Sequence, residues 1–124
     1  MKKIIVSRKL PKPVGPYSQA VKFENLLFLS GMGAFDASGK LIEGEIEDHV
    51  KKTLQNIEVL LKEAGSGLQN VLKVTIFLKN MDDFKRVNRV YAEFFSKNPP
   101  ARSTVEVSNL PAQMNIEIEV IAYV

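Results

Sequence analysis

Few residues in this chain could do chemistry, because several reactive types are missing. The sequence of 124 residues has no cysteine and a single histidine, His49. The lack of thiols excludes disulfides, thiolate metal sites and cysteine nucleophiles. His49 has only Asp48 beside it, so we expect an ordinary residue on the surface of a helix. The segment Gly31-Met32-Gly33 lacks the third glycine of a dinucleotide-binding loop, and we interpret it as a turn or a bulge.

Arg102 and two glutamates are the strongest remaining candidates. Arg102 follows Pro99-Pro100-Ala101, which holds the backbone extended, and its guanidinium could grip a carboxylate with two parallel hydrogen bonds. Glu117 and Glu119 are two residues apart, so they share one face of a strand, and their repulsion would raise the pKa of one of them toward the range useful for proton transfer. Two plainer interpretations stay open: Arg102 pairs with a glutamate across neighbouring strands, or the glutamates form a solvated edge.

Tyr17 and Asn88 are weaker candidates for a binding pocket. Tyr17 follows Gly15-Pro16 in a loop that could line a pocket. Asn88 stands on the polar side of a helix whose other side is apolar. Each of them alone is explained as well by an ordinary surface position.

The elements that must position these residues follow from the spacing of apolar side chains. Alternation predicts strands, and a period of three to four residues predicts helices. The predicted elements are strands over 18–23 and 25–32 joined at Glu24-Asn25, a helix over 46–64, a strand over 72–79, a helix that ends before Pro99, and strands over 102–108 and 115–122. In the strand over 72–79, Leu72, Val74, Ile76 and Leu78 share the apolar side. The second helix is predicted to have Asp82 or Asp83 as its N-cap and an apolar stripe of Phe84, Val87, Val90 or Tyr91, and Phe94. The order β-β-α-β-α-β-β indicates an α+β fold.

Two helices are most simply placed on one face of a mainly antiparallel sheet. By alternation we place Arg102, Thr104, Glu117 and Glu119 on the opposite face, together with Phe77 and part of the run from Leu26 to Leu29. That face is too apolar for water and too polar for a core. We therefore expect it to be buried against another subunit, with charged pockets at the seam.

Composition sets the remaining limits. With 45% hydrophobic and 25% charged residues, we expect one domain over residues 1–124. The net charge of +3 comes from basic residues interleaved with acidic ones, so nucleic acid is not an expected partner. The N-terminal apolar run, Ile4-Ile5-Val6, is too short for a signal peptide or a membrane span. We expect a cytoplasmic protein that does not contact membranes.

Several sequence motifs, in order along nearly the whole chain, resemble those of the RidA/YjgF family, the reactive enamine/imine deaminases. They are Gly15-Pro16-Tyr17-Ser18-Gln19-Ala20, Leu29-Ser30-Gly31, Val74-Thr75-Ile76-Phe77-Leu78, Asp83-Phe84, Val87-Asn88-Arg89-Val90-Tyr91, Pro99-Pro100-Ala101-Arg102-Ser103, and Leu110-Pro111 with Ile116-Glu117-Ile118-Glu119. The resemblance implies a chorismate-mutase-like fold and a homotrimer with sheets facing inward and clefts between subunits. It also implies hydrolysis of 2-imino acids, such as 2-iminobutanoate and 2-iminopropanoate, to 2-oxo acids and ammonia, without metal or cofactor.

Residue roles are implied by the same resemblance. Arg102 would hold the substrate carboxylate, with the backbone N–H of Thr104 beside it, and Glu117 would orient the attacking water. The positions of Tyr17, Ser30, Gly31 and Asn88 match other pocket-lining positions, some of them presented by a neighbouring subunit.

The sequence departs from the family pattern at Met32-Gly33-Ala34, where Gln and Ile-Pro are common, at Thr104, where Cys is common, and at Ala112-Gln113-Met114-Asn115, where a Lys-containing loop is usual. These departures leave the substrate range open. Two other functions are kept as alternatives: a trimeric module that binds carboxylates or regulates partners without turnover, and an endoribonuclease or translation inhibitor.

Overall fold

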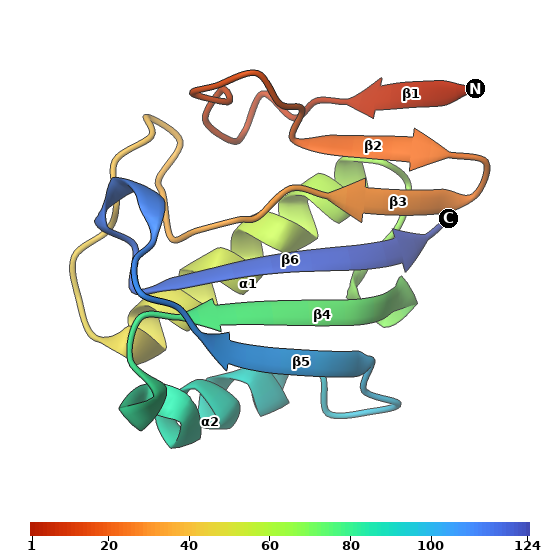
Figure 1. The fold of residues 1–124 in the computed structure, drawn as a ribbon. Helices are drawn as coiled ribbons and strands as arrows, with labels where there is room; N and C mark the ends of the chain where they lie inside the picture. Colours follow the sequence, from red (N-terminus) through yellow and green to blue (C-terminus); the bar gives the residue numbers. More distant parts are fainter.

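The computed structural model describes residues 1–124 and contains six strands and two α-helices (Figure 1). The elements are β1 (Lys2–Ile5), β2 (Ala20–Phe23), β3 (Leu26–Leu29), α1 (Ile46–Glu63), β4 (Val71–Leu78), α2 (Phe84–Phe94), β5 (Ala101–Glu106) and β6 (Ile116–Tyr123). The predicted α+β plan is confirmed, with β1 added at its start. Only Ile5 of the four residues of β1 is buried, so the sequence has no alternation of apolar and polar residues here that would predict a strand.

All strands belong to one sheet with the order β1-β2-β3-β6-β4-β5. Neighbouring strands are antiparallel except β4 and β5, which run parallel and are joined through α2. The last strand, β6, therefore lies in the middle of the sheet, while β5 forms an edge. No helix has the length and apolar character that crossing a bilayer requires.

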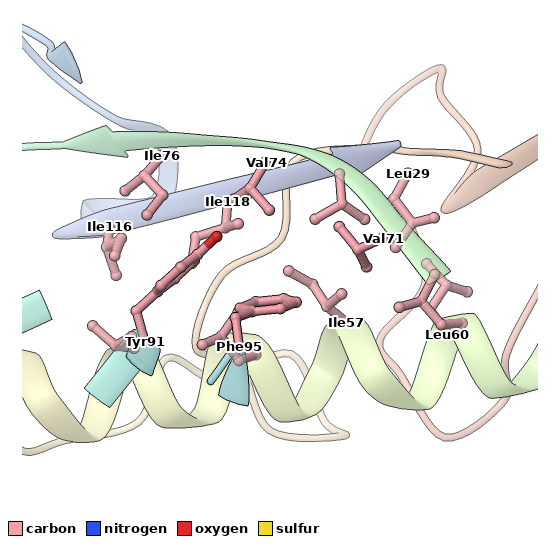
Figure 2. Close-up of a cluster of buried hydrophobic side chains, with 14 of the residues drawn as sticks. Leu29, Ile57, Leu60, Val71, Val74, Ile76, Tyr91, Phe95, Ile116 and Ile118 are labelled. Atoms are coloured by element: carbon pink, nitrogen blue, oxygen red, sulfur yellow. The ribbon is translucent and has the colours of Figure 1, made fainter. Parts of the chain in front are cut away.

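Both helices lie on one face of the sheet, as predicted, and the core fills the space between them (Figures 1 and 2). Val74 and Ile76 of β4 and Ile118 of β6 point down at the helices, and Tyr91 of α2 and Ile57 of α1 point up at the sheet (Figure 2). Each fully buried aliphatic side chain of this kind stabilises the fold by about 1.5–3 kcal/mol. This core holds the sheet and the helices together, and the candidate site residues lie on these elements.

Two predicted details of β4 and α2 are wrong. Leu72 was expected on the buried face of β4, but it is 46% exposed and Val71 is buried instead, because the register with β6 shifts between Val71 and Lys73. The side chain of Asp83 does not cap α2. The turn before α2 is held instead by Asn80, whose side chain accepts a hydrogen bond from the backbone N–H of Asp82 at 2.9 Å.

The prediction that His49 lies on the surface is also wrong, since it is only 4% exposed. It shares one side of α1 with Thr53 and Asn56, which are buried as well. The Asn56 amide donates hydrogen bonds to the carbonyls of Gly33 and Phe35, at 3.0 and 2.9 Å. A loop thus covers a side of α1 that the sheet does not reach, and polar residues on that side are buried.

Candidate active site

The position of Arg102 differs from the prediction. β5 pairs with β4, and the register places Arg102 beside Val74 and Thr104 beside Ile76. Side chains of residues in register point to the same face of a sheet, and Val74 and Ile76 are fully buried beneath the helices. Arg102 and Thr104 therefore lie on the helix face, not on the face of Glu117. Because β6 does not neighbour β5, a cross-strand pair between Arg102 and Glu117 is excluded.

The guanidinium of Arg102 rests on aromatic rings and has no polar partner in the chain. Its central carbon lies 4.6 Å from the ring centroid of Tyr91 and 5.7 Å from that of Phe84, distances at which a cation is attracted to a ring face. No hydrogen bond or ion pair in the chain involves it. Phe84 and Tyr91 are seven residues apart on α2, and Asn88 lies between them on the same side of the helix.

Three buried polar atoms accompany this guanidinium. The side-chain oxygens Asn88 Oδ1, Tyr91 Oη and Thr104 Oγ1 are buried and have no hydrogen-bond partner in the chain. A buried polar atom left without a partner costs about 1–3 kcal/mol. An unpaired cation together with such atoms is suited to binding a small polar anion whose own groups complete the hydrogen bonds.

Glu117 occupies the opposite face of the sheet, where it pairs with Phe77. A Cβ atom added to Gly31 would lie 2.5 Å from Glu117 Cδ, so the carboxyl group rests on backbone that only glycine leaves bare. Two backbone hydrogen bonds between Met32 and Ile118, of 2.7 and 2.9 Å, hold the Gly31 segment against β6. The close approach of Gly31 to the carboxyl group is thus built into the sheet, and Gly31-Met32-Gly33 is a bridged segment, not a free turn.

The environment of Glu117 favours its protonated form. Burial raises the pKa of Glu117, and the negative charge of Glu119 raises it further. The sequence predicted a raised pKa from the pair of glutamates. The direction is confirmed, but the larger cause is burial.

Glu117 lines a cleft of about 480 Å³. The cleft is walled by segments 10–19, 30–39 and 111–114. Tyr17, whose side chain is exposed, also lines it, and Tyr17 Oη accepts a hydrogen bond from the backbone N–H of Val14 at 3.4 Å. Ser30 lines the cleft as well, and its hydroxyl donates to the carbonyl of Ser18 at 2.6 Å, so this hydroxyl fixes one wall to its neighbour.

The predicted site residues therefore fall into two groups on opposite faces of the sheet. We name the first the carboxyl half-site; it consists of Tyr17, Ser30, Gly31 and Glu117. We name the second the guanidinium half-site; it consists of Asn88, Arg102 and Thr104. The chain does not bring the two half-sites together by itself. No group of His, Asp or Glu side chains in the chain could hold a metal ion.

The aromatic support of Arg102 was not predicted. Phe84 and Tyr91 were assigned only to the apolar stripe of α2, yet both rings also face the guanidinium. Burial raises the pKa of Tyr91, with the charge of Arg102 acting in the opposite direction. Aromatic residues on the apolar side of a helix can pack in the core and also contact a charged group on a neighbouring edge strand. The spacing of apolar residues in the sequence does not distinguish these two roles.

Two buried amides that shape the cleft were also missed. Gln19 donates to the carbonyl of Pro11 at 3.1 Å, which fixes the loop that carries Tyr17. Asn56 holds Gly33 and Phe35, as described above. Gln19 is two residues from Tyr17, and this closeness to the predicted pocket loop could have indicated its role. Asn56 precedes the buried Ile57 in the helix, and nothing in the sequence indicates that its amide is buried.

Comparison with known proteins places the chain in a family. The family model described as Endoribonuclease L-PSP matches residues 7–124. The chain belongs to this family, also called RidA/YjgF. A RutC family protein of Pyrococcus horikoshii is 48% identical over 99% of this chain and 98% of that protein. The 2-iminobutanoate/2-iminopropanoate deaminase of Mus musculus is 39% identical, covering 98% and 91% of the two chains.

The fold is shared with solved structures of the L-PSP family. TdcF of E. coli, whose crystal structure contains bound serine, superposes with a TM-score of 0.92 at 32% identity and covers 98% of both chains. The names found in the L-PSP family point to two activities, since the family description names an endoribonuclease and the mouse relative is a deaminase. The chemistry of the two half-sites bears on which of these this member carries out.

Proposed function

We propose that this chain forms a homotrimer that hydrolyses 2-imino acids, such as 2-iminobutanoate and 2-iminopropanoate, to 2-oxo acids and ammonia. One observation carries the proposal: a guanidinium without a partner and a carboxyl group with a raised pKa lie on opposite faces of one chain. A ring of identical subunits can place the guanidinium half-site of one chain over the carboxyl half-site of the next. The name of the mouse relative and the amino acid bound to the E. coli relative are consistent with this substrate class.

Arg102 is the proposed anchor for the substrate carboxylate. Its guanidinium has no competing partner in the chain, and the Tyr91 ring at 4.6 Å limits its freedom. Two parallel N–H···O bonds to a carboxylate fix both the position and the orientation of the substrate. Thr104 stands two residues further on the same face, and its unpartnered hydroxyl, or its backbone N–H, completes the anchor.

Glu117 of the neighbouring subunit is the proposed base. As the oxygen of a water molecule bonds to the imine carbon, one water proton passes to the Glu117 carboxylate and the nitrogen receives the electron pair of the C=N bond. Glu117 then returns that proton to the nitrogen, which gives a carbinolamine. Glu117 next accepts the hydroxyl proton and passes it to the nitrogen as the C–N bond breaks, so that ammonia leaves and the electron pair of the O–H bond forms the carbonyl of the 2-oxo acid.

The raised pKa of Glu117 suits this role, because a base is most effective when its pKa is near the working pH. An imine carbon is already electrophilic. Because of this, most of the rate acceleration can come from holding the substrate by its carboxylate and keeping a water molecule in contact with the imine carbon. Asn88 Oδ1 has no partner in the chain, and we assign it the role of accepting a hydrogen bond from the substrate nitrogen.

The test uses imine generated in situ from 2-aminobutanoate by an amino acid oxidase, with release of the 2-oxo acid as the signal. We expect Arg102→Ala and Glu117→Gln to lower kcat/KM at least about 100-fold, since each removes a charged hydrogen-bonding group. Arg89→Ala is the matched control, because Arg89 lies on α2, the helix that supports Arg102, but has a 72% exposed side chain that points at Glu47. We expect Arg89→Ala to keep wild-type activity.

Four results would contradict the proposal or support one of its alternatives. A wild-type rate equal to that of buffer would exclude the deaminase, and calorimetric binding of 2-oxobutanoate without turnover would identify a carboxylate-binding module instead. Sedimentation of a stable monomer would remove the site between subunits. RNA cleavage that persists in Arg102→Ala and Glu117→Gln would assign the function named in the family description to other residues.

A further inference from the structure

The cleft at Glu117 is larger than a two-carbon side chain requires. Its volume is about 480 Å³, within the range of pockets that enclose ligands of drug size. Only two of its lining side chains, Lys12 and Glu117, carry a charge. Much of the remaining wall is apolar and includes Leu10, Phe35 and Met114. This space extends beyond the residues that the proposed hydrolysis uses.

The apolar part of the cleft is closed at Gly33. A Cβ atom on Gly33 would lie 2.3 Å from Met114 Sδ and 2.7 Å from the Phe35 ring, so both side chains rest against the bare backbone of Gly33. We name Gly33, Phe35 and Met114 the apolar floor.

The apolar floor lies at a defined distance from the reacting group. Gly31 supports the Glu117 carboxyl group, and Gly33 supports the floor. Two residues of extended chain separate these points by about 6.6 Å, from a rise of about 3.3 Å per residue. An ethyl side chain on a carbon held at Glu117 is too short to cover this distance. A side chain of four carbons spans it.

The walls of this space are fixed before any ligand binds. The amide of Asn56 binds the carbonyls of both Gly33 and Phe35, and Gln19 binds the carbonyl of Pro11. Met114 is only 5% exposed. An apolar group that enters a preformed apolar space displaces water without rearranging the protein, which makes the gain from each added methylene close to its full transfer value.

We infer that the apolar floor binds the substrate side chain, so that the preferred substrates are 2-imino acids with apolar side chains of about four carbons rather than one or two. This inference rests on the proposed function. Gly33, Phe35 and Met114 are specificity residues and take no part in proton transfer. The base, the water and the carboxylate anchor act in the same way on short and long substrates.

The experiment is a chain-length series. Imines are generated by one oxidase from alanine, 2-aminobutanoate, norvaline and norleucine, and kcat/KM of the wild-type protein is measured for each. Burial of a methylene corresponds to about a fourfold gain, so we expect kcat/KM to rise about fifteenfold from the two-carbon to the four-carbon side chain. If no imine in the series is hydrolysed, the proposed function fails. If short imines are hydrolysed and the rate stays level or falls with length, the function stands and this inference fails.

Two variants test the floor in opposite directions. Gly33→Ala drives Met114 and Phe35 from their contact with the backbone of Gly33, and we expect at least a tenfold loss for the four-carbon substrate with less than a twofold change for the two-carbon one. Met114→Ala deepens the floor, and we expect the optimum to move to longer side chains. Met81→Ala is the matched control, since Met81 does not line the cleft.

An equal loss for all substrates in both variants would overturn the inference, because it would reveal a purely structural role. Gly33→Ala is judged only if it unfolds in a cooperative transition. If it does not fold, Met114→Ala and the wild-type series decide.

Discussion

The separation of the two half-sites predicts that two inactive variants restore each other. Arg102→Ala removes the guanidinium half-site and leaves Glu117 intact, and Glu117→Gln does the reverse. The two groups lie on opposite faces of one chain, so the proposed active site takes Arg102 from one subunit and Glu117 from another. A mixed trimer therefore contains some clefts with both native residues, although every chain in it carries a substitution.

The size of the recovery follows from counting. In trimers formed at random from equal amounts of the two variants, a cleft receives native Arg102 in about half of cases and native Glu117 in about half, so about one quarter of the clefts are complete. Neither substitution should prevent folding. Arg102 has no hydrogen bond in the chain to lose, and its contact with the rings is worth about 0.5–1 kcal/mol. Gln keeps the shape of Glu117.

The assay unfolds the two variants together in denaturant, refolds them and measures imine hydrolysis. Wild-type protein refolded in the same way sets the scale, and each variant refolded alone sets the background. We expect recovery to about one quarter of the wild-type rate after joint refolding, and little change when the folded variants are mixed briefly without denaturant. A jointly refolded sample that stays at background would refute the assignment of the two half-sites to different subunits.

Three further predictions concern the carboxyl half-site and the cleft around it. Glu119→Gln removes a charge that raises the pKa of Glu117, so the acidic limb of the kcat/KM profile should move to lower pH; an unmoved limb would show that Glu119 does not act on the base. Gly31→Ala places a Cβ 2.5 Å from Glu117 Cδ and should lower kcat about 100-fold with a cooperative melt retained, whereas an unchanged kcat would mean that the carboxyl position does not matter. Asn56→Ala leaves two carbonyls without donors and should reduce the free energy of unfolding by about 2 kcal/mol in urea titration, a loss that an equally stable variant would contradict.

The elements with a clear period could be predicted from the sequence, because their pattern reflects burial on one side. The helix expected over 46–64 is observed as Ile46–Glu63, since Val50, Leu54 and Ile57 all face the sheet. The turn expected at Glu24-Asn25 is also observed between β2 and β3, where Glu24 has a positive φ of 55°. Local patterns were sufficient where one face meets the core and the other meets solvent.

The face of Arg102 could not be predicted, because β5 is an edge strand and reverses the usual pattern. Its apolar residue Val105 is 43% exposed, while Arg102 and Thr104 point toward α2. Alternation assigns polar side chains to the outside, and that rule fails where a helix offers aromatic rings to a cation. The strand that pairs with β5 depends on the long connection through α2, and no local pattern encodes it.

The placement of the guanidinium and the carboxyl group on opposite faces has a kinetic consequence. Under the proposed function a single chain holds only one half of each active site, so we expect an isolated subunit to be inactive toward imines. A pair of subunits would contain one complete cleft and two unpaired half-sites, whereas a closed trimer would contain three complete clefts and no unpaired half-site. In dilute solution the rate should therefore rise faster than the first power of protein concentration, so that the cell's supply of this chain sets both the amount of catalyst and the fraction that is switched on.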